Sequence, residues 1–225
     1  MKIISLNVGL PRVLIDRGRE VTTGIFKSAV AGPLMLRRTN FDGDRQADLE
    51  HHGGINKAVY AYPYEHYDYW RAGLPGVELT SGNFGENLTT EGLLESEARI
   101  GDEFRVGEAV LKVAQPRLPC FKLGIRFGRD DMVKRFLASG RSGIYFAVVE
   151  EGLVNTGDAI ELLERGACGI TIAEVNRAYA HSRENLDLLR HIVAAEILPR
   201  GLQRDFVERL ASLEPRSAEA SSVEA

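Results

Sequence analysis

One cysteine of this chain is placed where its chemistry could be used. Cys120 lies in the stretch Gln115-Pro-Arg-Leu-Pro-Cys-Phe-Lys-Leu123, close to Arg117 and Lys122. A thiol acts as a nucleophile or as a soft-metal ligand only as the thiolate, and nearby cations favour that form. The two prolines of the stretch should end strand pairing and hold the cysteine on a stiff turn, because proline fixes φ and lacks an N–H. A buried, inert thiol is the alternative, since free cysteines are usually buried.

A second segment gathers further reactive groups, namely Asp48, His52, Gly53, Gly54 and Lys57. Glycines let backbone N–H groups approach a phosphate, and a lysine adds a point charge, so the segment is suited to anion capture. A zinc site is the alternative for the adjacent histidines His51 and His52. Neighbouring residues on a strand point in opposite directions, however, and no third ligand lies at a recognisable spacing, so the pattern does not favour zinc.

A third segment, residues 82–88, combines two glycines with the polar side chains Asn83, Glu86 and Asn87. Amide and carboxylate groups can bind the edge of a heterocycle or a phosphate. Asparagine and glycine are also ordinary turn residues, so the same segment could be a turn without a ligand.

A cysteine hydrolase is the competing interpretation of these groups. It would use Cys120 as the nucleophile, His52 as the base, and Asp48 or Asp44 to orient the base. No cysteine-protease signature surrounds Cys120, and its cationic neighbours explain a thiolate without a histidine. The hydrolase therefore takes second place.

Composition narrows the class of protein. The chain has 225 residues with 44% hydrophobic and 27% charged residues, which is typical of a globular protein with a substantial core. Its net charge of −4 gives no reason to expect binding to nucleic acid or to anionic membranes. The two cysteines cannot form a disulfide framework, and we find neither a signal peptide nor a run of membrane-spanning length. These features predict a cytoplasmic protein.

The elements that position the three segments are mainly strands. Short strands separated by glycine and proline predict a β-barrel or sandwich rather than repeated βαβ units. We expect strands at residues 2–8, 19–26, 58–62, 144–149 and 159–163, a turn followed by a strand within 28–37, and a hairpin at 100–113 that turns at Gly107-Glu108. Helices are expected at 64–71 and 132–137. Pro63 is expected to be the first residue of the first helix.

The pattern becomes helical after Gly166. Thr171 and Glu174 form a capping box before a helix at residues 172–179. Ser182 is expected to cap a second helix that ends near Glu196, and a third helix covers residues 202–213. We therefore predict an α+β, mainly β protein with a β domain at residues 1–168, a three-helix domain at 169–213, and a disordered tail at 214–225.

Several motifs together indicate a family, and they lie at residues 5–12, 23–27, 43–48, 52–63, 82–88, 115–123 and 140–143. With the helices that follow, they resemble the MOSC domain family, in its subgroup of YiiM-type 6-N-hydroxylaminopurine resistance proteins. The resemblance covers the chain in order to about residue 213. It implies a MOSC β-barrel-like domain with a C-terminal three-helix extension.

The resemblance also implies a chemistry. It implies a molybdopterin-type molybdenum cofactor whose metal is bound by Cys120, and a thiolate suits such a metal. The implied reaction is the reduction of N-hydroxylated compounds, such as 6-N-hydroxylaminopurine, to the amine, which detoxifies base analogues. Binding of pyridoxal phosphate is a further possibility at the level of the family. A non-catalytic carrier of the molybdenum cofactor or of sulfur is the alternative function.

The remaining site residues follow from the same resemblance. Cofactor-binding candidates are Gly53, Gly54, Lys57, Asn83, Glu86, Asn87, Arg117 and Arg141. Asp48 or His52 would donate protons to the departing hydroxyl. The chain has no iron–sulfur, flavin or nicotinamide motif, so an external electron-donor reductase is the expected partner. The C-terminal helices could dock that reductase or form a homodimer.

Overall fold

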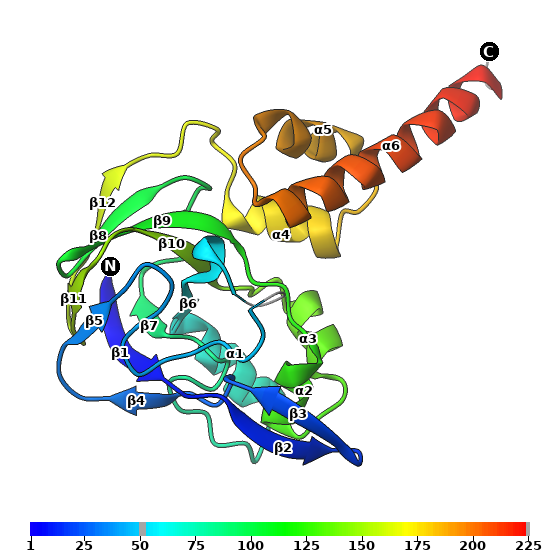
Figure 1. Cartoon of the computed structure of the whole chain (residues 1–225). Coiled ribbons are helices and arrows are strands. Elements are labelled where there is room, and N and C mark those ends of the chain that lie inside the picture. The colour runs from blue at the N-terminus through cyan, green and yellow to red at the C-terminus, as the bar shows by residue number, and fades with distance from the viewer. Residues whose placement is uncertain (50–52, 224–225) are drawn as a thin grey trace.

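The main feature of the fold is a strongly curved sheet of eight strands (Figure 1). The computed structural model describes residues 1–49 and 53–223. The eight strands are β1 (Lys2–Val8), β4 (Ser28–Val30), β6 (Val59–Pro63), β7 (Leu88–Glu91), β8 (Glu103–Val106), β9 (Ala109–Pro116), β10 (Ile144–Glu150) and β12 (Ile160–Glu164). Their order is β12-β8-β9-β10-β6-β7-β1-β4, and only the β6–β7 pair is parallel.

The sheet closes between β1 and β12, which are its first and last strands in the sequence. Lys2 forms an isolated antiparallel bridge with Ala159, just before β12. The N–H of Ile3 donates to the Asp158 carbonyl at 3.0 Å, and the N–H of Ile160 donates to the Met1 carbonyl at 2.9 Å. Closure satisfies backbone groups that an open edge would leave unpaired. The predicted barrel-like, sheet-rich domain is therefore confirmed.

Two short ribbons lie beside the main sheet. One is the hairpin of β2 (Arg12–Asp16) and β3 (Arg19–Thr23), and the other pairs β5 (Leu34–Leu36) with β11 (Gly152–Val154). The β2 strand is missing from the sequence prediction. Its apolar residues Val13 and Ile15 are exposed, so no buried face produces the alternation that marks a strand.

Strand β6 is buried on both faces, and its alternating residues enter two different hydrophobic clusters. Val59 and Ala61 point into the barrel, whereas Tyr60 and Tyr62 point into an aromatic cluster. Three helices cover that aromatic cluster: α1 (Glu65–Gly73), α2 (Phe121–Phe127) and α3 (Met132–Ser139). A short 3-10 helix, η1 (Ile55–Lys57), precedes β6. The arrangement fixes the strand from two sides.

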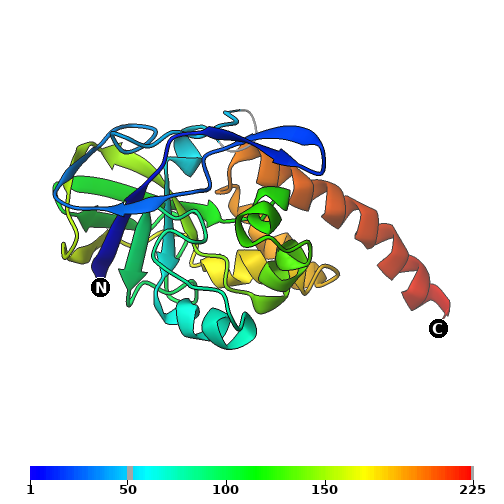
Figure 2. The same ribbon diagram turned by 90° about the horizontal axis from the view of Figure 1, so that it is seen from below.

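The C-terminal region consists of α4 (Ile172–Ala180), α5 (Leu186–Ala195) and α6 (Arg200–Val223). The predicted capping box is confirmed: Thr171 Oγ1 accepts from the N–H of Glu174 at 3.2 Å, and the Glu174 carboxylate accepts from the N–H of Thr171 at 2.8 Å. The buried residues of these helices, such as Val175, Ile192 and Phe206, belong to the same hydrophobic cluster as the barrel interior. The three helices are thus packed onto the barrel, and the distal part of α6 extends away from it (Figure 2).

Three details of the predicted elements are wrong. Asn185, not Ser182, caps α5, because its side chain accepts from the N–H of Leu188 at 3.0 Å. The third helix does not end at Leu213, since α6 runs from Arg200 to Val223. The disorder of residues 214–225 stays a prediction. Pro63 is the last residue of β6 rather than the first of α1.

Across residues 1–49 and 53–223, no helix combines the length and apolar character that spanning a bilayer requires.

Candidate functional site

The sequence segments that carry reactive groups meet at one cleft of about 690 Å³, a volume that includes space open to solvent. Of the predicted site residues, it is lined by Asp48, Lys57, Asn87, Arg117 and Cys120. Further lining residues come from the end of β3 and the chain after it, from the loops before η1, β7 and α2, and from β6, α2 and β10: Thr23, Gly24, Ile25, Lys27, Asp44, Arg45, Gln46, Ala47, Tyr60, Gly85, Leu118, Lys122 and Tyr145. Segments far apart in sequence therefore share one pocket.

Cys120 is placed by the end of a strand and the start of a helix. Strand β9 ends at Pro116, and α2 begins at Phe121, with Cys120 in an extended conformation as its N-cap residue. The prolines end strand pairing as predicted, but a helix follows the cysteine instead of a longer turn. The thiol is free and half-buried, so it can be reached from the cleft.

Arg117 is the most unusual cation of the cleft. It is 6% exposed, and its Nη1 has no hydrogen-bond partner. Its guanidinium carbon lies 5.0 Å from the centre of the Tyr60 ring and 5.2 Å from that of Phe136. Burial opposes the charge, yet Tyr60, Tyr145 and Cys120 together keep the pKa of Arg117 above its usual value. A buried donor without a partner is costly, so this site is suited to an anionic ligand.

A buried polar network supports another wall. Asp44 pairs with Lys27, and it accepts from the N–H of Gly9 at 2.9 Å and from Asn87 Nδ2 at 2.8 Å. Asn87 also accepts at Oδ1 from the N–H of Tyr60 at 3.2 Å. Burial lowers the pKa of Lys27, and Asp44 opposes that effect. Asn87 therefore connects the network to β6 and has a structural role as well as a place on the cleft.

The second segment reaches the cleft only in part. Asp48 and Lys57 line it, and burial lowers the pKa of Lys57 while the charge of Asp48 raises it. Gly53 and Gly54 do not line the cleft. A side chain at Gly53 would lie 2.7 Å from the backbone of Leu49, so this glycine permits a close chain approach. His52, the predicted proton donor or base, lies outside the described residues.

Glu86 and Asn83 hold their own loop together instead of facing the cleft. Glu86 is fully buried and accepts from the Tyr67 hydroxyl, from the N–H of Gly82 at 2.8 Å, and from that of Phe84 at 3.0 Å. Burial raises the pKa of Glu86, and its hydrogen bonds partly offset the rise. Asn83 Oδ1 accepts from Arg126 at 2.7 Å. Neither residue lines the cleft.

Arg141 also does not line the cleft. Its guanidinium carbon lies 3.8 Å from the centre of the Tyr69 ring, and its Nη1 donates to the Ser139 carbonyl at 3.0 Å. The next residue in the chain does contact the cleft wall, because the Ser142 carbonyl accepts from the Tyr60 hydroxyl at 2.9 Å. Arg141 thus belongs to the segment that supports Tyr60 from behind.

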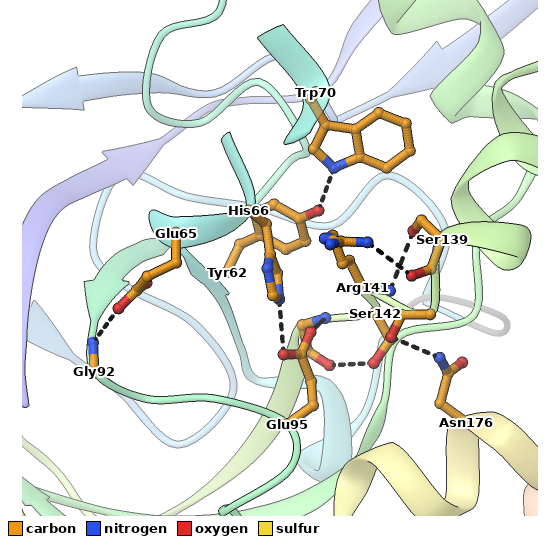
Figure 3. Close-up of polar contacts among 12 residues, drawn as sticks. Tyr62, Glu65, His66, Trp70, Gly92, Glu95, Ser139, Arg141, Ser142 and Asn176 are labelled. Carbon is orange, nitrogen blue, oxygen red and sulfur yellow. Dashed lines mark hydrogen bonds and ion pairs between the residues drawn. The ribbon is translucent and has the colours of Figure 1, made fainter. Parts of the chain in front are cut away.

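That supporting segment is fixed by the buried carboxylate of Glu95 and by the helical region (Figure 3). Glu95 accepts from the N–H of Gly143 at 2.6 Å and contacts His66 Nε2 at 2.8 Å. Asn176 of α4 donates to the Gly140 carbonyl at 3.0 Å. The wall that carries Tyr60 is therefore tied both to α1 and to the C-terminal helices.

Several residues of the cleft are missing from the sequence prediction. Lys27 lies in a recognised motif but does not stand out from its surroundings, and Tyr60 and Tyr145 belong to apolar strands. Tyrosines at alternate positions of a buried strand could have indicated a polar edge on that face.

The residues of the cleft fit a metal that is already held by an organic cofactor, and not a metal that protein side chains enclose. In the part of the chain that the structure describes, no group of three or more His, Cys, Asp and Glu residues could enclose a metal ion. Cys120 is a single soft donor, and the unpartnered Nη1 of Arg117 belongs to the same cleft. Five cationic and two acidic residues line that cleft. An anionic organic cofactor with a thiolate-bound metal would satisfy these groups.

Residues 48–161 match the family described as MOSC domain, and residues 170–213 match the family described as YiiM-like, 3-alpha helix domain. The chain belongs to the MOSC domain family, and it carries the helical domain of the YiiM-like members. The family resemblance of its motifs is confirmed.

Relatives support the assignment over nearly the whole chain. Uncharacterized protein YflK of Bacillus subtilis (strain 168) is 43% identical over 95% of this chain and 96% of its own length. Protein YiiM of Escherichia coli (strain K12) is 36% identical over 83% of this chain and 84% of its own length. A protein of Gibberella moniliformis named Reductase is 37% identical over 76% of this chain, which corresponds to 31% of that protein.

The fold also matches a solved structure. The crystal structure of YiiM from Geobacillus stearothermophilus superposes with a TM-score of 0.77 at 35% sequence identity, and the match covers 93% of this chain and 98% of that one. The barrel and the C-terminal helices are thus shared with a YiiM protein.

Proposed function

We propose that this protein is a molybdenum-cofactor-dependent reductase that converts N-hydroxylated compounds, such as 6-N-hydroxylaminopurine, to the corresponding amines. The observation that carries the proposal is the accessible thiol of Cys120 in the same cationic cleft as Arg117, a buried cation with an unpartnered donor. Membership of the MOSC domain family and the similarity to a protein named Reductase also support it.

Different residues of the cleft would bind different parts of the cofactor. Cys120 would bind the metal as thiolate, and Arg117 would neutralise an anionic group of the cofactor through charge-assisted hydrogen bonds. Tyr60 and Tyr145 would pack beside the bound ring system, since both line the cleft and Tyr60 contacts the guanidinium of Arg117. When bound, the cofactor supplies the two-electron redox chemistry.

The reaction itself requires protons as well as electrons. Reduction of R–NHOH to R–NH₂ breaks the N–O bond, consumes two electrons and two protons, and releases water. Asp48 lines the cleft and is the candidate to deliver a proton to the departing hydroxyl. The two electrons would come from an external electron-donor protein, with the three C-terminal helices as its candidate docking site.

A cytoplasmic location is consistent with two cysteines that are both free thiols. A homodimer through the C-terminal helices is the proposed alternative use of that region.

A carrier of the cofactor or of sulfur would use the same cleft without turnover, so activity has to separate the two functions. The experiment is to express the protein in a host that makes the molybdenum cofactor and to supply 6-N-hydroxylaminopurine with a chemical reductant such as reduced methyl viologen. The reductase is expected to form adenine, with the Cys120→Ala variant inactive. A molybdenum-loaded protein that forms no adenine would favour the carrier.

The cysteine hydrolase remains the weaker candidate. It needs His52, which lies outside the described residues, and no histidine of the described chain lines the cleft. Hydrolysis of a thioester or ester substrate by protein free of molybdenum would favour it over the reductase.

A further inference from the structure

The charges of the cleft are more numerous than one bound cofactor phosphate requires. Two of its five cations have an acidic neighbour: Lys27 pairs with Asp44, and Lys57 lies in the field of Asp48. The other three are Arg45, Arg117 and Lys122. Within the described part of the chain, the side chains of Arg45 and Lys122 make no ion pair or hydrogen bond.

These three cations lie at two depths. Arg117 is buried, and Tyr60, Tyr145 and Cys120 favour its charged form. Arg45 is exposed and Lys122 is half-buried, so the part of the cleft that they line is open to solvent. A phosphate held by the buried guanidinium leaves the pair at the opening without a counter-charge. The cleft therefore offers a second position for an anion, in a chain whose net charge is −4.

The shape of a nucleotide matches these two depths. In a 6-N-hydroxylaminopurine nucleotide, the reacting N-hydroxyl group and the 5′-phosphate are at opposite ends of the molecule. With the N-hydroxyl group directed to Cys120, the purine would lie along the tyrosines of the inner cleft, and the phosphate would extend toward the opening. A free base has no group that could use the cations there.

We infer that the substrates are N-hydroxylated purine nucleoside 5′-monophosphates, whose phosphate is bound by Arg45 and Lys122. The inference rests on the proposed reductase function and names the substrate class of that site. Because the phosphate binds at an accessible place, its attraction should weaken as salt rises.

Kinetics of the molybdenum-loaded protein test the substrate class. The 5′-monophosphate of 6-N-hydroxylaminopurine riboside is expected to have a kcat/KM at least about tenfold above that of the riboside or the free base, mainly through a lower KM, since one charged hydrogen-bonding partner has an effect of this order. Arg45→Ala and Lys122→Ala should each reduce this preference several-fold. Arg105→Ala, which removes an exposed arginine from β8, is the matched control and should keep it.

Calorimetric binding to the loaded protein gives a readout that does not depend on turnover. Adenosine 5′-monophosphate, the product, should bind at least about tenfold more tightly than adenosine, and the preference should decrease in Arg45→Ala and Lys122→Ala. Equal turnover and equal binding of base, riboside and monophosphate would overturn the inference while leaving the reductase intact. So would a loss of bound molybdenum in both variants without any nucleotide preference in the wild type, because the outer cations would then belong to the cofactor. If nothing is reduced but the monophosphate is preferred in binding, the phosphate site stands and the reductase fails.

Discussion

Lys27 and Asp44 form an ion pair from which water is almost excluded, with side chains that are 9% and 2% exposed. The same carboxylate binds Gly9 and Asn87, so it connects β1, the loop before η1 and the loop before β7. A buried pair of this kind is costly to break, because the remaining partner keeps an uncompensated charge away from water.

Asp44→Asn should therefore destabilise the protein by about 3–5 kcal/mol, since it leaves Lys27 buried and unpaired. Urea unfolding followed by circular dichroism measures the effect. The double variant Lys27→Met with Asp44→Asn should lose less than the single variant, because no charge then remains buried. A loss below about 1 kcal/mol in Asp44→Asn would show that the pair is hydrated in solution.

Glu86 should make the stability depend on pH. Burial raises the pKa of Glu86 above its usual 4.5, so the folded state holds this proton more tightly than the unfolded state. Its contribution is fully present below pH 4.5 and is lost as the pH rises through the raised folded pKa. The stability of the wild type relative to Glu86→Gln should thus fall as the pH rises from 4.5 to neutrality. Unfolding free energies of both proteins across this range test the sign, and a difference that does not change with pH would contradict it.

Replacing Arg117 should separate stability from ligand binding. Arg117→Met keeps much of the apolar stem and removes a buried donor without a partner, so the cofactor-free protein should gain about 1–3 kcal/mol of stability. The same variant should retain less cofactor when expressed in a competent host. Thermal unfolding and molybdenum content of the purified protein are the two measurements. A variant that is less stable and fully loaded would mean that Arg117 serves the fold instead of the ligand.

Replacing Gly143 should destabilise the protein, because β6, which carries Tyr60 of the cleft, packs directly against this glycine. It has a φ of 66°, and a Cβ atom there would lie 2.6 Å from the Ala61 carbonyl oxygen and 2.6 Å from the Tyr60 ring. Gly143→Ala should therefore destabilise the protein by more than about 2 kcal/mol, as strain and overpacking add. Gly140→Ala is the control, since Gly140 has a similar φ of 69° but open space around it, and it should cost only about 1–2 kcal/mol. Equal losses in the two variants would refute the steric argument.

The sequence is sufficient to predict elements whose signals are local. The capping box at Thr171 and the hairpin turn between β8 and β9 depend on neighbouring residues, and both occur in the structure. The sequence predicts Ser182 as the N-cap of α5, but Asn185 directly precedes Leu186, and its side-chain oxygen accepts from the N–H of Leu188. The choice between two capable caps depends on where the helix packs.

The sequence also does not predict which way single side chains of the cleft region point. Glu86 and Asn87 are adjacent, and the sequence predicts the same cofactor-binding role for both. In the structure the carboxylate of Glu86 accepts hydrogen bonds from N–H groups of its own loop, whereas Asn87 lines the cleft. The orientation of each side chain is set by tertiary contacts with Tyr67 and Asp44, and these contacts cannot be derived from spacing.

The most direct test of the central claim is the molybdenum content of three proteins expressed in a host that makes the cofactor: the wild type, Cys120→Ala and Cys168→Ala. Cys168 is the control because its thiol contacts the backbone at Ile100 and Ile170 and does not line the cleft. We expect close to one molybdenum per wild-type chain, the same in Cys168→Ala, and a loss of at least about tenfold in Cys120→Ala, since this variant lacks the one thiol among the described residues that line the cleft. Equal molybdenum in all three proteins, or none in the wild type, would contradict it.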